Sequence, residues 1–430
     1  MINFNLLKPN KDWSFSDVKR GKTLYATHGY HKYPAKFIPQ LVRKVIVKYS
    51  RPGEVVLDSF GGCGTTLVEA KLSGRKSIGL DVNKVAVLIS KAKTIGIKPD
   101  LLQERNRVLL EKIEGRTSSK DYYEHANERL KYWFKPEQYN KLKLIYGCIQ
   151  EEPNKKIKLL YYCCFSNILK NCSIWLAKSI KPQRDFEKKE EEPFIAFKKH
   201  LNYMTKKNTE FVDLVTSKNV SDVSCKMLKG DAKKVKLPGE HVDLIVTSPP
   251  YVTSYEYAEL HQLSILWFGF TDDIKKIKND FVGTVSKKRI RKVMESELAE
   301  SLVSKLKEKS RKLARHVSNY YFDLTKCYKE MFRVLKKDKY LCIIIGDTEY
   351  DNTKIPNAEI SMQLLENIGF EVKCVIKRKL SSKIFTPYRN KMGRFTDASQ
   401  GSKRKIYQYE YLIFARKPNV KVTGERNAKS

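Results

Sequence analysis

The sequence lacks several features that would place it in common classes of protein. No apolar run approaches the length of about 20 residues that crosses a bilayer, and residues 1–11 are polar, without the apolar segment of a signal peptide. The nine cysteines include no CxxC pair, and the adjacent Cys163 and Cys164 suit neither a zinc site nor a disulfide framework. We therefore expect a cytoplasmic protein without metal or membrane, whose cysteines are small buried hydrophobes.

Acidic residues are scarce relative to basic ones. The chain has 84 Lys and Arg against 48 Asp and Glu, a formal net charge of +36. Self-repulsion of this charge opposes folding, and a polyanion that releases counterions on binding would offset it. The excess therefore favours a nucleic acid partner, although a lysine-rich host would give the same composition. With 41% hydrophobic residues in 430, the chain can bury a core in roughly two to three domains.

Seven short strand candidates can be identified, and most are apolar or β-branched runs that end at Gly, Asp or Pro, as is typical of strands buried on both faces of a parallel sheet. Helical patterns such as Thr66–Leu72, Tyr321–Leu335 and Ala358–Ile368 alternate with several of them. This alternation predicts a doubly wound α/β fold with a mostly parallel seven-stranded sheet. The expected strands are Glu54–Leu57, Lys76–Leu80, Cys225–Leu228, Val242–Val246, Tyr340–Ile345, Glu371–Lys377 and Gln408–Ala415.

Two stretches interrupt the alternation. The longer one has helical apolar spacing, including a buried helix expected over Ile157–Trp175, and predicts a mostly helical insertion subdomain. The shorter one is highly charged. The expected order is 1–98 and 225–416 for the two halves of the sheet domain, 99–224 for the helical insertion, 271–317 for the charged insertion and 417–430 for a frayed tail.

The first chemical motif is a glycine-rich turn between a strand and a helix, in Val55–Thr66. Gly62 and Gly64 allow close approach of backbone amides to a ligand, and the following helix start offers free N–H groups. Asp81, after the next strand, can accept hydrogen bonds from ribose hydroxyls. The spacing differs from GxGxxG and no Walker lysine follows, which excludes a P-loop. An ordinary tight strand–helix turn is the alternative.

The second motif is a proline-stiffened loop, Thr247–Tyr251, directly after a strand. Two prolines fix two φ angles and remove two donors, so that the Pro249 carbonyl and the Ser248 hydroxyl can accept hydrogens from a conjugated amine such as that of a nucleobase. The Tyr251 ring suits stacking on an extruded base. A structural Pro-Pro turn is the alternative. The chain has no Pro-Cys dipeptide, which disfavours a cysteine nucleophile and cytosine-C5 chemistry.

Together the two motifs resemble the cofactor and catalytic motifs of the DNA amino-methyltransferases of restriction–modification systems. Tyr33–Pro39 resembles the segment before the first strand of that family, Gly230–Ala232 the acidic turn that contacts the cofactor adenine, and Met331–Asp347 the later sheet. The resemblance implies a Rossmann-like methyltransferase that uses S-adenosylmethionine to methylate flipped bases in double-stranded DNA, with a restriction endonuclease acting separately. The implied cofactor residues are Tyr33, Pro34, Phe37, Pro39, Asp58, Phe60, Gly62, Gly64, Thr65, Asp81, Asp231 and Thr247, and the implied catalytic residues are Ser248, Pro249, Pro250 and Tyr251.

The loop also bears on the target base. Its Ser-Pro-Pro-Tyr form resembles the cytosine-N4 members, whereas adenine-N6 members more often have Asp or Asn at the position of Ser248. Adenine-N6 methylation is the nearest alternative, and a catalytically inactive DNA-binding protein on the same fold is another; an RNA methyltransferase would usually carry an added RNA-binding module. Two departures from the family are Ser59, where proline is usual, and the place of the large insertion, which leaves open where DNA is recognised.

DNA contacts are expected first from the helical insertion, and then from two further basic clusters. His28 and His31 precede the Tyr33–Pro39 segment; we expect ordinary hydrogen-bonding histidines there, because the amine loses its proton readily during methyl transfer. The candidate DNA-binding residues are Lys178, Lys181 and Arg184 in the insertion, Lys287, Lys288 and Arg289 in the charged stretch, and Arg389 and Arg394 between the last two strands.

Overall fold

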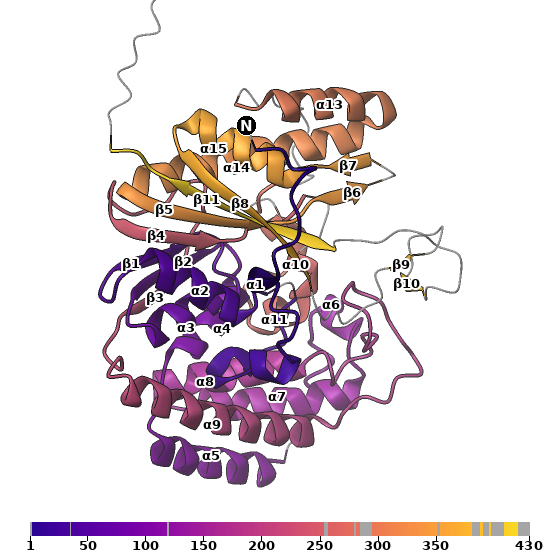
Figure 1. The fold of residues 1–430 in the computed structure, drawn as a ribbon. Coiled ribbons are helices and arrows are strands. Elements are labelled where there is room, and N and C mark those ends of the chain that lie inside the picture. Colours follow the sequence, from indigo (N-terminus) through magenta and orange to yellow (C-terminus); the bar gives the residue numbers. More distant parts are fainter. Residues whose placement is uncertain are drawn as a thin grey trace, which may run out of the picture.

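The computed structural model describes residues 2–34, 36–117, 120–252, 257–278, 281–283, 295–350, 353–380, 388–389, 395–396 and 408–419. A central sheet lies between two layers of helices, and the helices of the insertion form a further layer beyond one of them (Figure 1). Among the helices of these residues, none combines the length and the apolar character that a membrane span requires.

The seven predicted strands form one sheet, which confirms the expected fold class. Its order is β3-β2-β1-β4-β5-β11-β8, and all neighbours are parallel except β11, which is antiparallel to β5 and β8. The strand order reverses between β1 and β4, and ligands of such sheets bind at this switch point. The strands are β1 Val55–Asp58, β2 Lys76–Asp81, β3 Cys225–Lys229, β4 Val242–Thr247, β5 Leu335–Ile345, β8 Glu371–Lys379 and β11 Tyr409–Arg416.

Apolar faces of helices cover both sides of the sheet. On one side lie α2 (Pro39–Tyr49), α3 (Thr65–Leu72) and α4 (Lys84–Thr94), and on the other α14 (Arg311–Val334) and α15 (Asn357–Ile368). Helix α14 begins ten residues before the predicted Tyr321, which shortens the expected charged insertion. In its first turns, basic residues alternate with apolar ones, so the apolar stripe that packs against α13 (Glu297–Lys309) is hard to recognise in the sequence. The stripe comprises Leu313, Ala314, Val317 and Tyr320.

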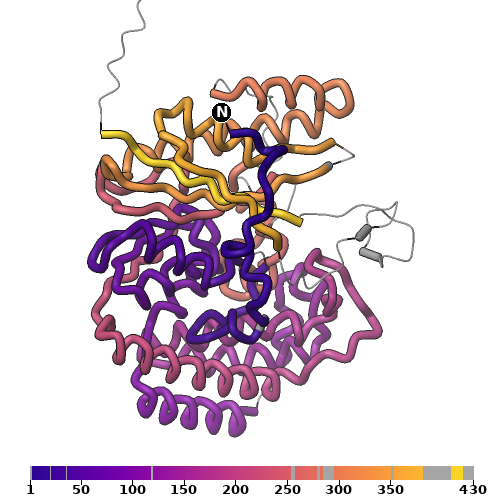
Figure 2. The backbone as a smooth tube through the Cα atoms, viewed as in Figure 1, coloured from indigo at the N-terminus to yellow at the C-terminus, as the bar shows by residue number. Residues whose placement is uncertain are grey.

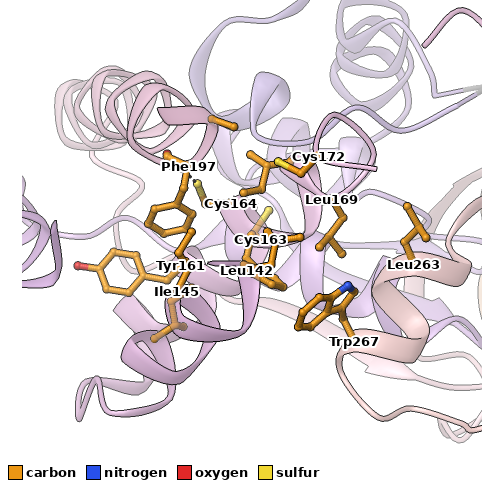
Figure 3. Packing of buried hydrophobic residues seen from close by; sticks show 14 of the residues in the cluster. Leu142, Ile145, Tyr161, Cys163, Cys164, Leu169, Cys172, Phe197, Leu263 and Trp267 are labelled. Atoms are coloured by element: carbon orange, nitrogen blue, oxygen red, sulfur yellow. Dashed lines mark hydrogen bonds between the residues drawn. The ribbon is translucent and has the colours of Figure 1, made fainter. Parts of the chain in front are cut away.

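The stretch expected as an insertion is helical, as predicted, but its core is not separate. Buried side chains of α7 and α8 pack with those of α4 and with Leu263 and Trp267 of α11 (Gln262–Trp267), as Figure 3 shows for the last two residues. The predicted helix over Ile157–Trp175 is wrong at its end, because the chain turns after Ile168 and Trp175 pairs back with Arg184. The helices are α5 Pro99–Glu114, α6 Glu128–Lys131, α7 Pro136–Gln150, α8 Lys155–Ile168 and α9 Pro193–Ser217.

The N-terminal segment crosses the edge of the sheet before it reaches α2 (Figure 2). The Asn10 amide donates to the Lys377 carbonyl of β8 at 2.8 Å. At the other end, Lys417 does not belong to a frayed tail, since its Nζ donates to the Leu335 carbonyl at 2.8 Å; residues 420–430 lie outside the described part. The remaining short elements are α1 Lys11–Ser14, η1 Arg20–Thr23, η2 Ala26–Gly29, α10 Tyr257–Leu260, α12 Ile274–Lys278, β6 Thr348–Tyr350, β7 Thr353–Ile355, β9 Tyr388–Arg389 and β10 Phe395–Thr396.

Candidate active site

The buried Asp58 carboxylate joins the two sequence motifs. It lies at the end of β1 and accepts hydrogen bonds at 2.6 Å from the hydroxyls of Thr66, in the helix after the glycine turn, and Thr247, at the end of β4. The Phe60 amide also donates to it at 3.1 Å. Burial raises the pKa of Asp58, and these three hydrogen bonds oppose the shift. The glycine turn and the Pro-Pro loop, far apart in sequence, therefore meet at one edge of the sheet.

The glycine turn depends on two residues with positive φ. Gly62 has φ of 46° and Gly64 has φ of 77°, a region that favours glycine. Gly64 also directly precedes α3, and a Cβ there would lie 2.8 Å from Cβ and 3.0 Å from Cα of Ser90 in α4. The turn is therefore pressed against α4 with no room for a side chain.

Gly64→Ala should destabilise the protein more than Gly53→Ala. Both glycines have positive φ, so both substitutions carry a backbone cost of about 1–3 kcal/mol. A Cβ at Gly53 meets nothing within 4 Å, whereas the Cβ at Gly64 overpacks α4 and adds roughly 1–3 kcal/mol. Chemical denaturation measures both free energies of unfolding. Equal losses at the two positions would contradict the close packing of the turn.

Carboxylates also end the next two strands. Asp81, at the end of β2, accepts from the Gly62 amide at 3.0 Å and from the Asn83 amide at 2.8 Å. The Gly230 amide, after β3, donates to the Asp81 carbonyl at 3.1 Å, which places the neighbouring Asp231 at the same edge. Burial raises the pKa of Asp81 to about 6. Asp81 and Asp231 thus follow neighbouring strands at this edge, where ribose hydroxyls could donate to them, whereas both oxygens of the buried Asp58 already accept hydrogen bonds from the protein.

The raised pKa of Asp81 predicts a pH-dependent affinity for a nucleoside ligand. Ribose hydroxyls donate to the ionised carboxylate, so binding favours the charged form and should weaken as the pH falls through 6. With a pKa of about 6 and binding by the ionised form, the affinity at pH 5 should be about tenfold lower than at pH 8. Calorimetric titration with S-adenosylmethionine measures it, and Asp81→Asn should bind weakly but without this pH dependence. An unchanged pH dependence in Asp81→Asn would contradict the assignment.

An aromatic stack borders the glycine turn. The Tyr33 ring lies nearly parallel to His261, with ring centroids 4.8 Å apart, and a Cβ on Gly62 would lie 3.6 Å from Tyr33 Cε1. The Asn83 amide and His261 Nδ1 are 3.1 Å apart, and burial lowers the pKa of His261 to about 4, which keeps the ring neutral. Sequence reasoning identified Tyr33 but missed Asn83 and His261. Asn83 had a local signal, since it caps α4 two residues after Asp81.

The rest of the segment before α2 supports the scaffold. Phe37 packs against the cluster between α2 and the sheet, and the buried Pro39 is the first residue of α2. Pro34 is partly exposed. Contact of these three residues with a cofactor stays a prediction.

Both N-terminal histidines have structural partners, which agrees with the expected hydrogen-bonding role. His28 Nε2 lies 2.7 Å from Oε1 of the buried Glu69, and Arg43 pairs with the other oxygen at 2.8 Å. His31 Nε2 lies 2.9 Å from the Ser166 hydroxyl. Burial lowers the pKa of both histidines.

Polar atoms without partners lie near the glycine turn. Within the described part of the chain, Lys93 Nζ and Ser90 Oγ, both on α4, are buried and have no hydrogen-bond partner. Burial raises the pKa of the Cys63 thiol in the turn, but the charges of Lys93 and Lys36, together with side-chain hydrogen bonds, lower that pKa overall. Lys93 Nζ forms no ion pair with a carboxylate of the described residues, so an anionic ligand group could pair with it. The carboxylates at the strand ends and this positive region fit a ligand with both a ribose and an amino-acid carboxylate, such as S-adenosylmethionine.

Side chains of β8 and β11, two strands on the other side of β5 from β4, hold the proline loop in place. Tyr251 donates to Glu410 Oε1 at 3.0 Å, and Glu410 Oε2 accepts from Arg378 Nε at 3.0 Å and Nη2 at 2.7 Å. Burial and the Glu410 carboxylate hold the pKa of Tyr251 well above its usual value, so the phenol stays a donor. A Cβ on Gly346 would lie 3.0 Å from the Tyr251 ring, so glycine leaves room for it. Sequence reasoning missed Glu410 and Arg378, which carry no local signal, and gave no role to Gly346, although it lies in the Met331–Asp347 segment.

The loop itself exposes its residues unequally. Pro249 is buried, whereas Ser248, Pro250 and Tyr251 are partly exposed. Thr247 is fully buried, and its hydroxyl oxygen also accepts from the Phe60 amide at 3.1 Å. The loop that carries the predicted acceptors, the Ser248 hydroxyl and the Pro249 carbonyl, therefore starts directly beside the glycine turn.

The predicted DNA-binding residues fall in two groups. Lys178, Lys181 and Arg184 are exposed in the loop between α8 and α9. Of the second group, Lys287, Lys288, Arg289 and Arg394 lie outside the described residues, and for Arg389 only the backbone, in β9, is described.

Comparisons with known proteins agree with this arrangement. A family model described as DNA methylase matches residues 5–92 and 242–429, on either side of the helical insertion. The type II methyltransferase M.MvaI of Kocuria varians is 29% identical over 83% of this chain and 85% of its own length. The type II methyltransferase M.BsoBI of Geobacillus stearothermophilus is 22% identical over 80% of this chain and 78% of its own.

Two further similarities are more limited. The DNA adenine methyltransferase YhdJ of Escherichia coli is 36% identical over 75 residues, 17% of this chain and 24% of its own. Among solved structures, a putative DNA modification methylase from Thermus thermophilus, complexed with S-adenosyl-L-methionine, matches 45% of this chain and 55% of its own at 18% identity and a TM-score of 0.22.

Proposed function

We propose that this protein methylates the N4 amine of cytosine in duplex DNA. The chain belongs to the DNA methylase family and is an S-adenosylmethionine-dependent DNA methyltransferase of the type that modifies base amines. The base would be flipped out of the helix and would attack the methyl group directly. The observation that supports methyl transfer at this edge is the Asp58–Thr247 hydrogen bond of 2.6 Å, which joins the glycine turn to the Ser-Pro-Pro-Tyr loop, and Ser248 in that loop favours cytosine.

The proposed chemistry is positioning and electrostatics. S-adenosylmethionine supplies an electrophilic methyl group on a sulfonium. The amine of cytosine is a weak nucleophile because its lone pair is conjugated with the ring. The Ser248 hydroxyl and the Pro249 carbonyl would accept its hydrogens and make the lone pair available. Tyr251, anchored through its hydroxyl to Glu410, would present its ring to the flipped base.

Ser248 favours cytosine, because the resembling adenine-N6 enzymes more often carry Asp or Asn there. The adenine alternative has its own support in the short match to a DNA adenine methyltransferase. The matched 75 residues are a small part of the chain, whereas the relatives matched over most of it are named only as type II methyltransferases. We therefore place cytosine first and adenine second.

Mass analysis of nucleosides separates the two targets. Unmethylated amplified DNA is incubated with the protein and S-adenosylmethionine carrying a deuterated methyl group, and then digested. Deuterated N4-methylcytosine is the expected product. Deuterated N6-methyladenine would establish the second candidate, and no labelled base with retained DNA binding would establish an inactive DNA-binding protein. Modification-sensitive sequencing of the same product maps the methylated site.

The proposed cellular role is modification of cytoplasmic DNA against a separate cognate restriction endonuclease. The type II names of the relatives matched over most of the chain support it. We assign target recognition to residues 99–224, because this stretch lies between the two segments that match the family. Lys178, Lys181 and Arg184 are its proposed contacts, and their exposure supports the assignment.

A further inference from the structure

We propose that Tyr132, Arg184 and Phe186 form a rigid DNA-contacting cluster, in which Arg184 meets a phosphate and the Phe186 ring inserts between bases of the duplex at the methylation site. We refer to these three residues as the cation–aromatic cluster. The inference rests on the proposed function and names the residues through which DNA is opened.

The cluster is a cation held between two exposed rings. The Arg184 guanidinium carbon lies 3.9 Å from the Tyr132 ring centroid and 4.6 Å from that of Phe186. Phe186 is 65% exposed and Tyr132 is 40% exposed, so both rings keep large apolar surfaces in contact with solvent. Exposure of these rings to water is unfavourable. A partner that offers both an anionic group for the cation and flat bases for the rings would cover them.

A buried layer holds the cluster in place. Arg184 pairs with Trp175 in an antiparallel bridge, and the Asp185 amide donates to the Ile174 carbonyl at 2.8 Å. Trp175 stacks on Trp133, with ring centroids 4.9 Å apart, and both indoles are buried. Because Trp133 follows Tyr132 in the chain, the same stack supports both sides of the cluster. Little conformational freedom would be lost when DNA binds.

The cluster is connected to the edge of the active site. Arg129 Nε and Trp133 Nε1 both donate to the side-chain oxygen Oε1 of Gln262, at 2.9 Å and 3.1 Å. Gln262 follows His261, whose ring stacks on Tyr33 beside the glycine turn. In Figure 1, α6 lies next to α11, and the two helices are in contact. A duplex bound at the cluster would therefore approach the catalytic edge of the protein rather than the opposite end of the insertion.

We commit to DNA as the occupant because several cations lie near the rings, although Asp185 and Glu187 flank Phe186 in the chain. Lys178 and Lys181 are exposed on the same loop, and Arg129 stacks on Tyr132 at 4.9 Å. These cations suit phosphates, and an inserted side chain is a common means of unstacking a base step. An acidic protein surface would satisfy the cations but would give the rings no bases to stack on.

Phe186→Ala tests the inserted ring, with Ile195→Ala as the matched control. Ile195, at the start of α9 in the same insertion, is 64% exposed, so its substitution removes a similar amount of apolar surface. The probe is a duplex with the mapped site, either fully paired or mismatched at the target base. Phe186→Ala should weaken binding of the paired duplex by roughly 5- to 100-fold. The loss should be smaller for the mismatched duplex, where unpairing costs less.

The outcomes distinguish failure of the inference from failure of the proposed function. If the wild-type protein methylates DNA but Phe186→Ala binds both duplexes as Ile195→Ala does, the cluster is not the contact. An equal loss on both duplexes overturns insertion of the ring. If the wild-type protein methylates no base, the proposed function fails whatever the cluster does. Unchanged binding of S-adenosylmethionine by both variants shows that they are folded.

Arg184→Ala tests the phosphate contact. It should weaken binding and lower the slope of log Kd against log salt concentration by about 1. The control is Arg107→Ala on α5, because Arg107 is exposed but already paired with Glu104 and Glu111. A salt slope unchanged from wild type in Arg184→Ala would overturn the contact.

Discussion

Tyr251→Ala should lower kcat for methyl transfer by about two to three orders of magnitude while duplex binding persists. The substitution removes the ring proposed to stack on the flipped base, and it removes the hydroxyl that ties the catalytic loop to Glu410. The loop would then no longer hold the Ser248 and Pro249 acceptors against the amine. Single-turnover methylation measures the chemical step, and a gel-shift or anisotropy titration measures duplex binding.

Tyr251→Phe separates the two roles of this residue. It keeps the ring but loses the 3.0 Å hydrogen bond to Glu410, whose carboxylate stays paired with Arg378. We expect a loss of about tenfold, since one hydrogen bond to a charged group is worth roughly 1.5–3 kcal/mol and the ring still packs. Pro249→Ala, which loosens the loop from its rigid conformation, should also abolish most of the activity. Full activity in Tyr251→Ala would rule out the stacking role.

Asp58→Ala should destabilise the protein by about 3 kcal/mol or more and abolish binding of S-adenosylmethionine. The carboxylate is buried and accepts hydrogen bonds from Thr66, Thr247 and the Phe60 amide. Alanine leaves three donors without this acceptor and disconnects the glycine turn from the catalytic strand. Denaturant unfolding measures the loss of stability, and calorimetric titration measures cofactor binding.

Asp58→Asn is the matched control for this prediction. Burial already raises the pKa of Asp58, so a neutral side chain of the same shape should be tolerated better than alanine. The amide oxygen can still accept one hydroxyl hydrogen, and the loss should be smaller by at least about 1 kcal/mol. A double-mutant cycle of Asp58→Asn with Thr247→Val then measures the link between the motifs. A coupling energy of zero would show that the Asp58–Thr247 hydrogen bond does not contribute to stability.

The conformational preferences and hydrophobicity of individual residues were enough to predict much of this protein's fold. The seven strands could be predicted because most of them are apolar runs of about four to eight residues that stop at Gly, Asp or Pro, which reflects burial on both faces of a sheet. The glycine turn and the proline loop were also readable, since positive φ and fixed φ are properties of individual residues. The sequence therefore determined the fold class, the glycine turn and the conformation of the proline loop.

Contacts between distant segments were settled only by the tertiary structure. Thr247 lies 189 residues after Asp58, and nothing in either segment shows that β1 and β4 are neighbours. The same is true of the Tyr251–Glu410 contact, across 159 residues, and of the core that α11 shares with the insertion. Helix α14 begins earlier than predicted because Ser310 caps it, accepting a hydrogen bond from the Leu313 amide at 3.3 Å, and because its early turns pack on α13. A sequence records what each segment prefers, whereas a site depends on which segments the sheet order brings together.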